Sequence, residues 1–190
     1  TVSAVRRSKK PNEVSNLHAE VSQDMWKDFD GISEIIPITN SQNQKYWQDK
    51  SIRNALEKKN SATYKRRKKA LKKQLFEEVF KQTGKQFDPN VLTFVWARRF
   101  AGYKRADLLF HDFERFERLI HNSEYPIQII WAGKPYPFDY GAIEVFNNLI
   151  DVSKQRENLA VLTGYELELS RALKCGSDVW LNTPRITREA

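Results

Sequence analysis

The sequence has few of the residues that would crosslink it or place it in a membrane. Its 190 residues include one cysteine, Cys175, and one methionine, Met25. A single thiol excludes an internal disulfide framework and agrees with a reducing compartment, so we predict a cytoplasmic location. The three histidines, His18, His111 and His121, are scattered and predict no metal site. No apolar run approaches the roughly 20 residues that a membrane-spanning helix needs, and we expect no secretory signal.

Positive charge is in excess, with 32 Lys and Arg against 24 Asp and Glu and a net charge of +8. Nine of these cations lie between residues 58 and 73, where there is no acid. Leu71, Leu75 and Val79 form an apolar stripe, which predicts a helix over about 62–81 with the cations on its solvated face. No stacking platform or base-reading motif accompanies the run, so nucleic-acid binding is disfavoured. A basic module that binds a polyanion is the non-enzymatic alternative.

The two parts of the chain, residues 1–87 and 88–190, differ in composition. The first part is polar and predicts helices over about 15–29 and 48–81, with an irregular stretch between them. The second part alternates two patterns: strands near 91–97, 126–132, 159–163 and 178–182, and helices near 106–121, 139–154 and 166–174. This alternation predicts βαβ units and a parallel sheet, and therefore an α/β fold. The carboxyl ends of its strands would share one edge, where ligands bind in such folds.

The apolar run at 91–97 leads directly into four cations, Arg98, Arg99, Lys104 and Arg105. The helix expected after residue 106 would place them at the positive end of its dipole, which costs stability unless a negative ligand is held. The cluster therefore predicts an anion site at the carboxyl edge of the sheet. Ordinary surface cations after a strand are the alternative.

The segment Arg-Arg-Phe-Ala-Gly-Tyr-Lys-Arg at 98–105 resembles the phosphate-site motif of the glycogen and α-glucan phosphorylases, especially the short bacterial type. Three later segments resemble motifs of that family in the same order: Trp-Ala-Gly-Lys-Pro-Tyr-Pro at 131–137, Leu-Thr-Gly-Tyr at 162–165, and Ser-Asp-Val-Trp-Leu-Asn-Thr-Pro-Arg at 177–185. Four motifs in sequence over roughly half the chain make the resemblance specific, because each must also occupy its required strand-turn context.

The resemblance implies a GT-B fold, in which two Rossmann-like domains face a cleft. Residues 1–87 would be the helical segment on the hinge side, and residues 88–190 the first half of the C-terminal domain. The chain is thus expected to be a fragment of a longer enzyme. In this family a lysine in a Ser-Gly-Thr-x-x-Met-Lys segment holds pyridoxal phosphate as a Schiff base. That lysine would follow Ala190 and lie outside this chain.

The activity implied is that of a glycosyltransferase of carbohydrate metabolism. A glucosyl unit would pass from an α-1,4-glucan to inorganic phosphate and form glucose 1-phosphate, and the fragment alone is expected to be inactive. The partners implied are α-glucan, inorganic phosphate and glucose 1-phosphate, with no nucleic acid and no membrane. A GT-B synthase that uses a nucleotide sugar is the enzymatic alternative, because its cations would face a diphosphate leaving group.

Five residues match phosphate or cofactor positions of the family. Arg99 and Lys104 match the two positions that bind the substrate phosphate beside the cofactor phosphate, so they are the catalytic candidates. Arg98 matches a further cationic position. An Arg fork and a Lys point charge suit a phosphate dianion. Lys134 and Tyr165 are candidate contacts with the cofactor or with phosphate, with a turn role for the first and a packing role for the second as alternatives.

Two C-terminal residues are candidate substrate contacts. Glu189 matches a residue that hydrogen-bonds the glucosyl hydroxyls, and Asn182 lies in the Asp-Val-Trp-Leu-Asn segment. The chain also departs from the family pattern at four positions: Glu13 and Ser41 replace glycines, Asn43 replaces a histidine that lines the sugar site, and Glu166 stands where many long-type members have arginine. The departures in the N-terminal part predict either altered substrate contacts or a diverged, less active lineage. Glu166 argues against one contact with the cofactor phosphate.

Overall fold

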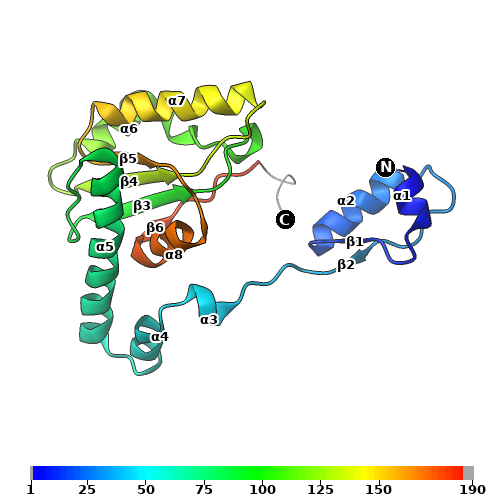
Figure 1. Ribbon diagram of the computed structural model, residues 1–190, viewed down its shortest axis with the longest axis horizontal. Helices are drawn as coiled ribbons and strands as arrows, with labels where there is room; N and C mark the ends of the chain where they lie inside the picture. Colours follow the sequence, from blue (N-terminus) through cyan, green and yellow to red (C-terminus); the bar gives the residue numbers. More distant parts are fainter. Residues whose placement is uncertain (1, 186–190) are drawn as a thin grey trace. The chain divides into compact units, whose positions relative to one another are not determined.

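The computed structural model describes residues 2–185, which form two compact units (Figure 1). Among the described residues, the first unit holds residues 2–43 and Arg185, and the second holds Gln44–Pro184. The predicted division at 87/88 concerns the domains of a longer parent protein and stays a prediction. None of the helices in the described part of the chain combines the length and apolar composition that a membrane crossing requires.

The first unit is small and built around one helix. Its elements are α1 (Val2–Arg7), β1 (Asn12–Glu13), α2 (Asn16–Trp26) and β2 (Ile36–Pro37), and the two short strands pair in parallel. The Ser15 hydroxyl caps α2 by accepting a hydrogen bond from the His18 backbone N–H at 3.2 Å. Glu13, one of the departures from the family pattern, accepts a hydrogen bond from the Ser22 hydroxyl at 2.8 Å. This carboxylate therefore joins β1 to α2.

The second unit contains a four-stranded parallel sheet, which confirms the predicted α/β fold. Its strands are β3 (Leu92–Ala97), β4 (Ile127–Ala132), β5 (Leu159–Leu162) and β6 (Val179–Trp180). They lie in the order β5-β4-β3-β6 (Figure 1). Numbered by their place along the chain, this is the order 3-2-1-4, which is the beginning of a doubly wound Rossmann sheet. The strand order reverses between β3 and β6, so ligands are expected at the carboxyl ends of these two strands.

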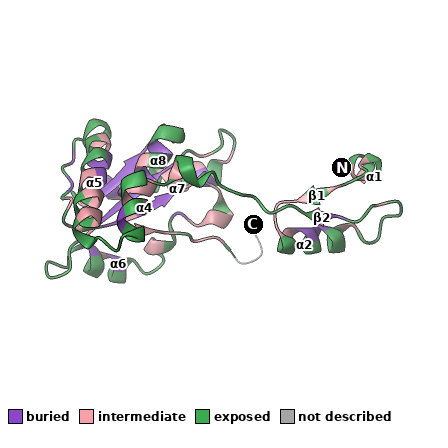
Figure 2. Ribbon diagram, turned by 90° about the horizontal axis from the view of Figure 1, so that it is seen from below, coloured by how far each residue is buried: buried purple, intermediate pink, exposed green. Residues whose placement is uncertain are grey.

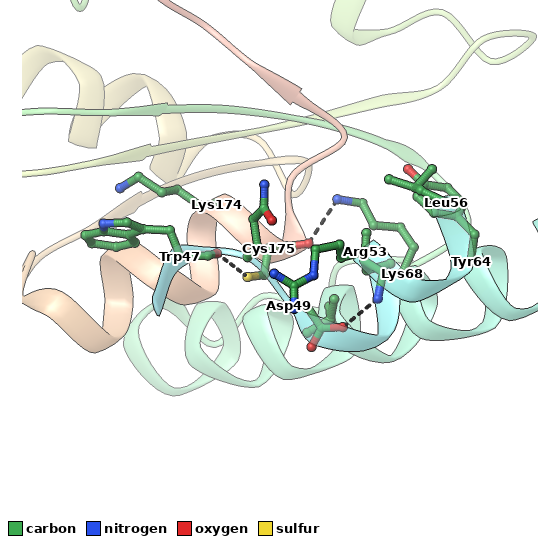
Figure 3. Close-up of a pocket in the computed structure, with 11 residues that line it drawn as sticks. Trp47, Asp49, Arg53, Leu56, Tyr64, Lys68, Lys174 and Cys175 are labelled. Atoms are coloured by element: carbon green, nitrogen blue, oxygen red, sulfur yellow. Dashed lines mark hydrogen bonds between the residues drawn. The ribbon is translucent and has the colours of Figure 1, made fainter. Parts of the chain in front are cut away.

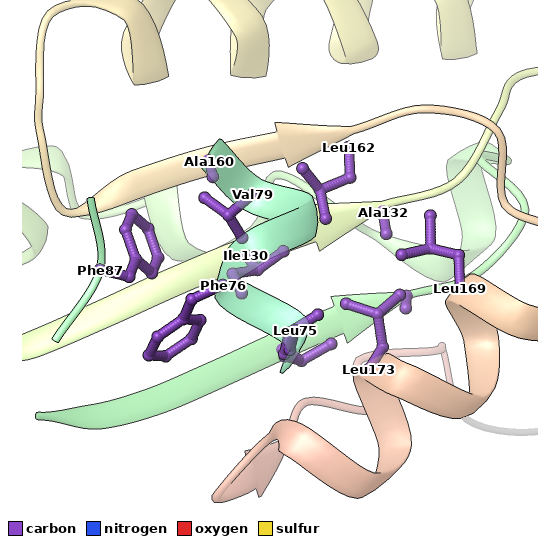
Figure 4. Close-up of a cluster of buried hydrophobic side chains, with 12 residues drawn as sticks. Leu75, Phe76, Val79, Phe87, Ile130, Ala132, Ala160, Leu162, Leu169 and Leu173 are labelled. Carbon is purple, nitrogen blue, oxygen red and sulfur yellow. The ribbon is translucent and has the colours of Figure 1, made fainter. Parts of the chain in front are cut away.

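Helices cover both faces of this sheet. The helices of the second unit are α3 (Gln44–Trp47), α4 (Lys50–Glu57), α5 (Ser61–Thr83), α6 (Phe113–Ile120), α7 (Tyr140–Lys154) and α8 (Leu167–Gly176). One core cluster joins α5 and α8 to the strand residues on the sheet face that these helices cover, including Val95 and Ile130 (Figure 4). The other joins α6 and α7 to the alternate residues, including Trp96 and Trp131. Both faces of the central strands are therefore buried, as their continuous apolar composition predicts (Figure 2).

The helix expected over 106–121 begins only at Phe113, so that prediction was wrong for its first part. Residues 98–112 instead form an irregular loop with two 3-10 turns, η1 (Gly102–Lys104) and η2 (Leu108–Phe110). Arg105 has a left-handed φ of 48°, so no helix runs through this residue. The Asp112 carboxylate caps the start of α6 by accepting a hydrogen bond from the Arg115 N–H. The four cations therefore lie within an irregular loop and not at a helix N-terminus, so no helix dipole acts on them.

The prediction for the basic helix was confirmed for its apolar stripe and wrong for part of its cationic face. Leu71, Leu75 and Val79 of α5 are buried. Lys72, however, is only 4% exposed and forms an ion pair with Asp178. Lys68 is half-buried and donates to backbone carbonyls at the end of α8. These two amines lie inward because α5 packs against α8 and the start of β6, where carbonyl and carboxylate oxygens can satisfy them.

Candidate phosphate site at the carboxyl edge of the sheet

The predicted phosphate-binding loop continues the pairing of β3 with β4 past the ends of both strands. The Arg98 N–H donates to the Ala132 carbonyl at 3.1 Å, and the Phe100 N–H donates to the Lys134 carbonyl at 3.2 Å. The Phe100 side chain is 1% exposed and packs against neighbouring aromatic rings. The backbone on both sides of Arg99 is thereby fixed. Arg98 is half-buried and Arg99 is exposed at the carboxyl edge.

The loop is also tied to the segment that follows β6. The Arg105 guanidinium donates to the carbonyls of Thr183 and Pro184, each at 2.8 Å. The Thr183 hydroxyl lies 2.8 Å from the Lys104 carbonyl and accepts from the Trp96 indole N–H at 3.0 Å. Arg105 is therefore a structural bridge across the point where the strand order reverses. Lys104 itself is half-buried, with its Nζ 5.3 Å from the centre of the Tyr103 ring.

Lys134 follows Gly133. The ends of β3 and β4 approach each other so closely that only a glycine fits at position 133. The φ of Gly133 is +152°, and a Cβ there would collide with the Arg98 carbonyl oxygen. Lys134 is exposed and lies 3.5 Å from the carboxylate of Glu166. Both side chains are at least 70% exposed, so this pair contributes little to stability. The contact nevertheless joins Glu166, one of the departures from the family pattern, to Lys134, one of the residues predicted to bind phosphate or the cofactor.

Tyr165 packs against the core and reaches the end of β3. Its hydroxyl donates to the Ala97 carbonyl at 3.1 Å and accepts from the Ser170 hydroxyl at 3.2 Å. The Ser170 hydroxyl accepts in turn from Lys174 Nζ at 2.6 Å. The observed contacts of Tyr165 are therefore structural, and they hold the last residue of β3 next to the cationic loop.

The comparisons with known proteins identify the family. No protein-family model matches the chain. The chain is 30% identical to the maltodextrin phosphorylase of Thermococcus litoralis in an alignment that covers 100% of the chain. It is 35% identical over 127 residues, or 65% of the chain, to the glycogen phosphorylase of Aquifex aeolicus. The chain belongs to the glycogen and α-glucan phosphorylase family.

This phosphorylase-family chain matches only part of each relative. It is 47% identical over its whole length to an uncharacterized protein of Methanocaldococcus jannaschii. The alignments cover 36% of that protein, 28% of the maltodextrin phosphorylase and 18% of the Aquifex glycogen phosphorylase. The chain therefore spans about a third or less of the length of these relatives. The family that the four motifs predicted is confirmed.

The other predicted substrate contacts lie after β6. Asn182 is exposed one residue before Thr183, whose hydroxyl contacts the cationic loop, so it lies at the same edge of the sheet. Glu189 lies outside the described residues.

The phosphorylase-family loop after β4 adds a feature that our sequence reasoning missed, since Tyr136, Phe138 and Tyr140 are 61%, 74% and 76% exposed. Their alternation in a proline-containing loop was the available signal.

Proposed function

We propose that this chain carries the phosphate-binding part of an α-glucan phosphorylase. The whole enzyme would transfer a glucosyl unit from an α-1,4-glucan to inorganic phosphate and release glucose 1-phosphate. One observation supports this most strongly: Arg98, Arg99 and Lys104 share one braced loop at the carboxyl ends of β3 and β6. Doubly wound sheets bind ligands at that position. The relatives named maltodextrin phosphorylase and glycogen phosphorylase agree with it.

The two catalytic candidates have complementary roles in this proposal. Phosphorolysis brings a phosphate dianion to a glycosidic bond, so the site must hold that dianion and stabilise the negative charge around it. Arg99 presents a planar fork that can bind two oxygens, and Lys104 adds a compact charge. The bridge from Arg105 to the segment after β6 holds the loop in place. A fixed loop loses little conformational entropy on binding, which favours both affinity and orientation.

Pyridoxal phosphate is the cofactor that the family implies. The donors at this edge suit its phosphate group, because several cations are present and the ion pair that Lys134 forms within residues 2–185 is an exposed one with Glu166. Bound there, the cofactor would supply a phosphate that exchanges a proton with the substrate phosphate. Arg98 and Lys134 would neutralise that group, and Tyr165 would hold the end of β3 beside it. The Schiff-base lysine is not expected among these 190 residues.

The glucan would meet the exposed rings of the β4–α7 loop. The Tyr136 and Phe138 rings lie 6.0 Å apart between centroids and follow β4 at the carboxyl edge. Aromatic rings offer a flat apolar face, and tyrosine adds a hydroxyl, which together suit the mixed surface of a sugar ring. Replacing both residues by alanine is expected to weaken maltodextrin binding to the chain while phosphate binding stays unchanged.

Phosphate binding by the purified chain tests the proposal. Inorganic phosphate is titrated into the chain and into two variants, Arg99→Gln and Lys104→Gln, with heat release as the readout. We expect each change to weaken binding about tenfold or more, since a charge-assisted hydrogen bond is lost. Arg115→Gln on α6 is the matched control, because it removes an exposed charge elsewhere. If Arg115→Gln weakened phosphate binding as much as the other two changes, the loss of affinity would follow from net charge alone. That result would contradict a phosphate site at Arg99 and Lys104.

A further inference from the structure

One hydroxyl group, that of Thr183, joins the segment after β6 to the cationic loop. It accepts a hydrogen bond from the Trp96 indole N–H at 3.0 Å. It also lies 2.8 Å from the Lys104 carbonyl and 3.0 Å from the Arg105 carbonyl, so its single hydrogen is donated to these oxygens. A single side chain thus connects β3, the backbone of a catalytic candidate and the segment that leaves β6.

The backbone at Lys104 and Arg105 has a conformation that needs support from outside the loop. Lys104 ends the 3-10 turn η1, and its N–H donates to the Ala101 carbonyl at 2.9 Å. Arg105, the next residue, has a φ of 48° although it carries a Cβ. Such a conformation costs free energy and persists where the surrounding structure fixes it. The Thr183 hydroxyl and the bonds from the Arg105 guanidinium to the carbonyls of Thr183 and Pro184 supply that support.

Thr183 itself has a fixed position relative to the sheet. Two residues earlier, the Leu181 N–H donates to the Val95 carbonyl of β3 at 2.8 Å. Thr183 is half-buried, and Trp96, whose indole it accepts from, is 1% exposed. Without the hydroxyl, this buried N–H would lose its acceptor and the Lys104 carbonyl would face an apolar group. The position of the Lys104 backbone therefore depends on the hydroxyl of Thr183.

We propose that Thr183 is a positioning residue of the phosphate site and couples this site to residues 181–184. The inference rests on the proposed function. Thr183 would not contact phosphate itself, but it fixes the backbone from which the Lys104 side chain extends toward the ligand shared with Arg99. Asn182, the predicted substrate contact, lies one residue away. Movement of residues 181–184 would therefore change phosphate affinity, and by linkage phosphate would change this segment.

The phosphate affinity of three threonine variants tests the proposal. Inorganic phosphate is titrated into the chain and into Thr183→Val, Thr183→Ser and Thr93→Val, with heat release as the readout. We expect Thr183→Val to weaken binding about tenfold, and Thr183→Ser, which keeps the hydroxyl, to stay within about twofold of the parent chain. Thr93→Val is the matched control and should keep the affinity. Thr93 is fully buried at the amino end of β3, where its hydroxyl contacts the Val91 carbonyl and Gln128.

NMR of the ¹⁵N-labelled chain measures the coupling directly. Phosphate is added while the Trp96 indole N–H and the backbone amides of 181–183 are followed. We expect these signals to shift with phosphate saturation in the parent chain and in Thr183→Ser, and the shifts to be lost in Thr183→Val. The Trp47 indole N–H is the internal reference. It belongs to a cavity of about 250 Å³ between α4, α5 and α8, which residues 98–105 do not line (Figure 3).

The outcomes separate this inference from the proposed function. Parent-like affinity of Thr183→Val, together with weak binding by Arg99→Gln, would overturn the coupling alone. Equal losses in Thr183→Val and Thr93→Val, or in Thr183→Val and Thr183→Ser, would overturn it as well, because the hydroxyl would then have no specific role. Parent-like affinity of Arg99→Gln would overturn both proposals. If Thr183→Val does not fold, the shifts at Trp96 and 181–183 in the parent chain decide, and their absence contradicts the coupling.

Discussion

At the scale of single residues, the cations of this chain have three different roles. Arg99 is exposed at the carboxyl edge, where a ligand can reach it. The Arg105 guanidinium donates its hydrogen bonds to backbone carbonyls 78 and 79 residues away along the chain. Lys72 is buried and paired with Asp178, whose carboxylate also accepts from the Thr93 N–H at 2.9 Å. Arg99 and Arg105, six residues apart, therefore differ: the Arg105 guanidinium is bonded to the fold, whereas that of Arg99 is exposed, and we propose that it binds phosphate.

The Lys72–Asp178 pair gives a prediction about stability. Asp178→Asn leaves the Lys72 ammonium buried without a counter-charge, so we expect the free energy of unfolding to fall by about 3–5 kcal/mol. Urea denaturation at neutral pH measures it. Asp151→Asn is the control, because its pair with Lys154 is exposed at both side chains and should contribute less than about 1 kcal/mol. A loss no larger than that of the control would mean that the buried pair is well solvated in solution.

Asp49 gives a prediction about pH. Its pKa is lowered in the folded chain by the Arg67 hydrogen bond, so its contribution to stability is present above the unfolded value of about 3.9. That contribution is lost as the pH falls through the lower, folded pKa. Asp49→Asn should therefore be less stable than the parent chain at pH 7, with a difference that shrinks toward pH 2. Thermal unfolding across this range measures it, and a constant difference would contradict the linkage.

At the scale of elements, the strands could be predicted closely and the loop after β3 could not. The expected strands at 91–97, 126–132 and 159–163 differ from β3, β4 and β5 by one residue at one end of each, because their apolar runs need burial on both faces. β6 is shorter than expected, since in the described part of the chain it is an edge strand and pairs with β3 on one side. The loop from 98 to 112 depends on hydrogen bonds to residues 183 and 184, and no local pattern reports those.

The candidate site divides in the same way. Motif order identified Arg98, Arg99 and Lys104, and the observed sheet places them at its carboxyl edge. The structural role of Arg105, the burial of Lys72 and the partial burial of Lys68 escaped prediction, because a lysine reaches inward only where carbonyls of another element lie below it. Their binding roles stay predictions until a ligand is measured.

The contact between α5 and α8 gives an element-scale prediction. Gly176 lies so close to α5 that an added Cβ would be 2.8 Å from the Leu75 Cβ, and Leu75 is fully buried. Gly176→Ala should therefore lower the free energy of unfolding by about 1–3 kcal/mol. Gly141→Ala is the matched control in α7, where the nearest atom is 3.9 Å away. It should be neutral or stabilising by about 0.5 kcal/mol in the same denaturation experiment.

At the scale of the whole molecule, the chain spans about a third or less of the relatives it matches. Phosphorolysis depends on holding phosphate, cofactor and glucan together. A part of the enzyme that carries only the proposed phosphate site would therefore catalyse the reaction slowly at best. We therefore expect the purified chain to release no glucose 1-phosphate from maltodextrin. Incubation with pyridoxal phosphate and reduction by borohydride should label no lysine stoichiometrically. Turnover together with one labelled lysine would place the cofactor lysine within these residues.

The most direct test of the central claim is the position of a bound oxyanion. Crystals of the chain are soaked in tungstate, a phosphate analogue whose anomalous scattering locates it without ambiguity. We predict a peak within hydrogen-bond reach of the Arg99 guanidinium and Lys104 Nζ, at the carboxyl ends of β3 and β6. Phosphate at higher concentration should displace it. A peak on the exposed lysines of α5, with these two side chains directed away from each other, would contradict a phosphate site in this loop.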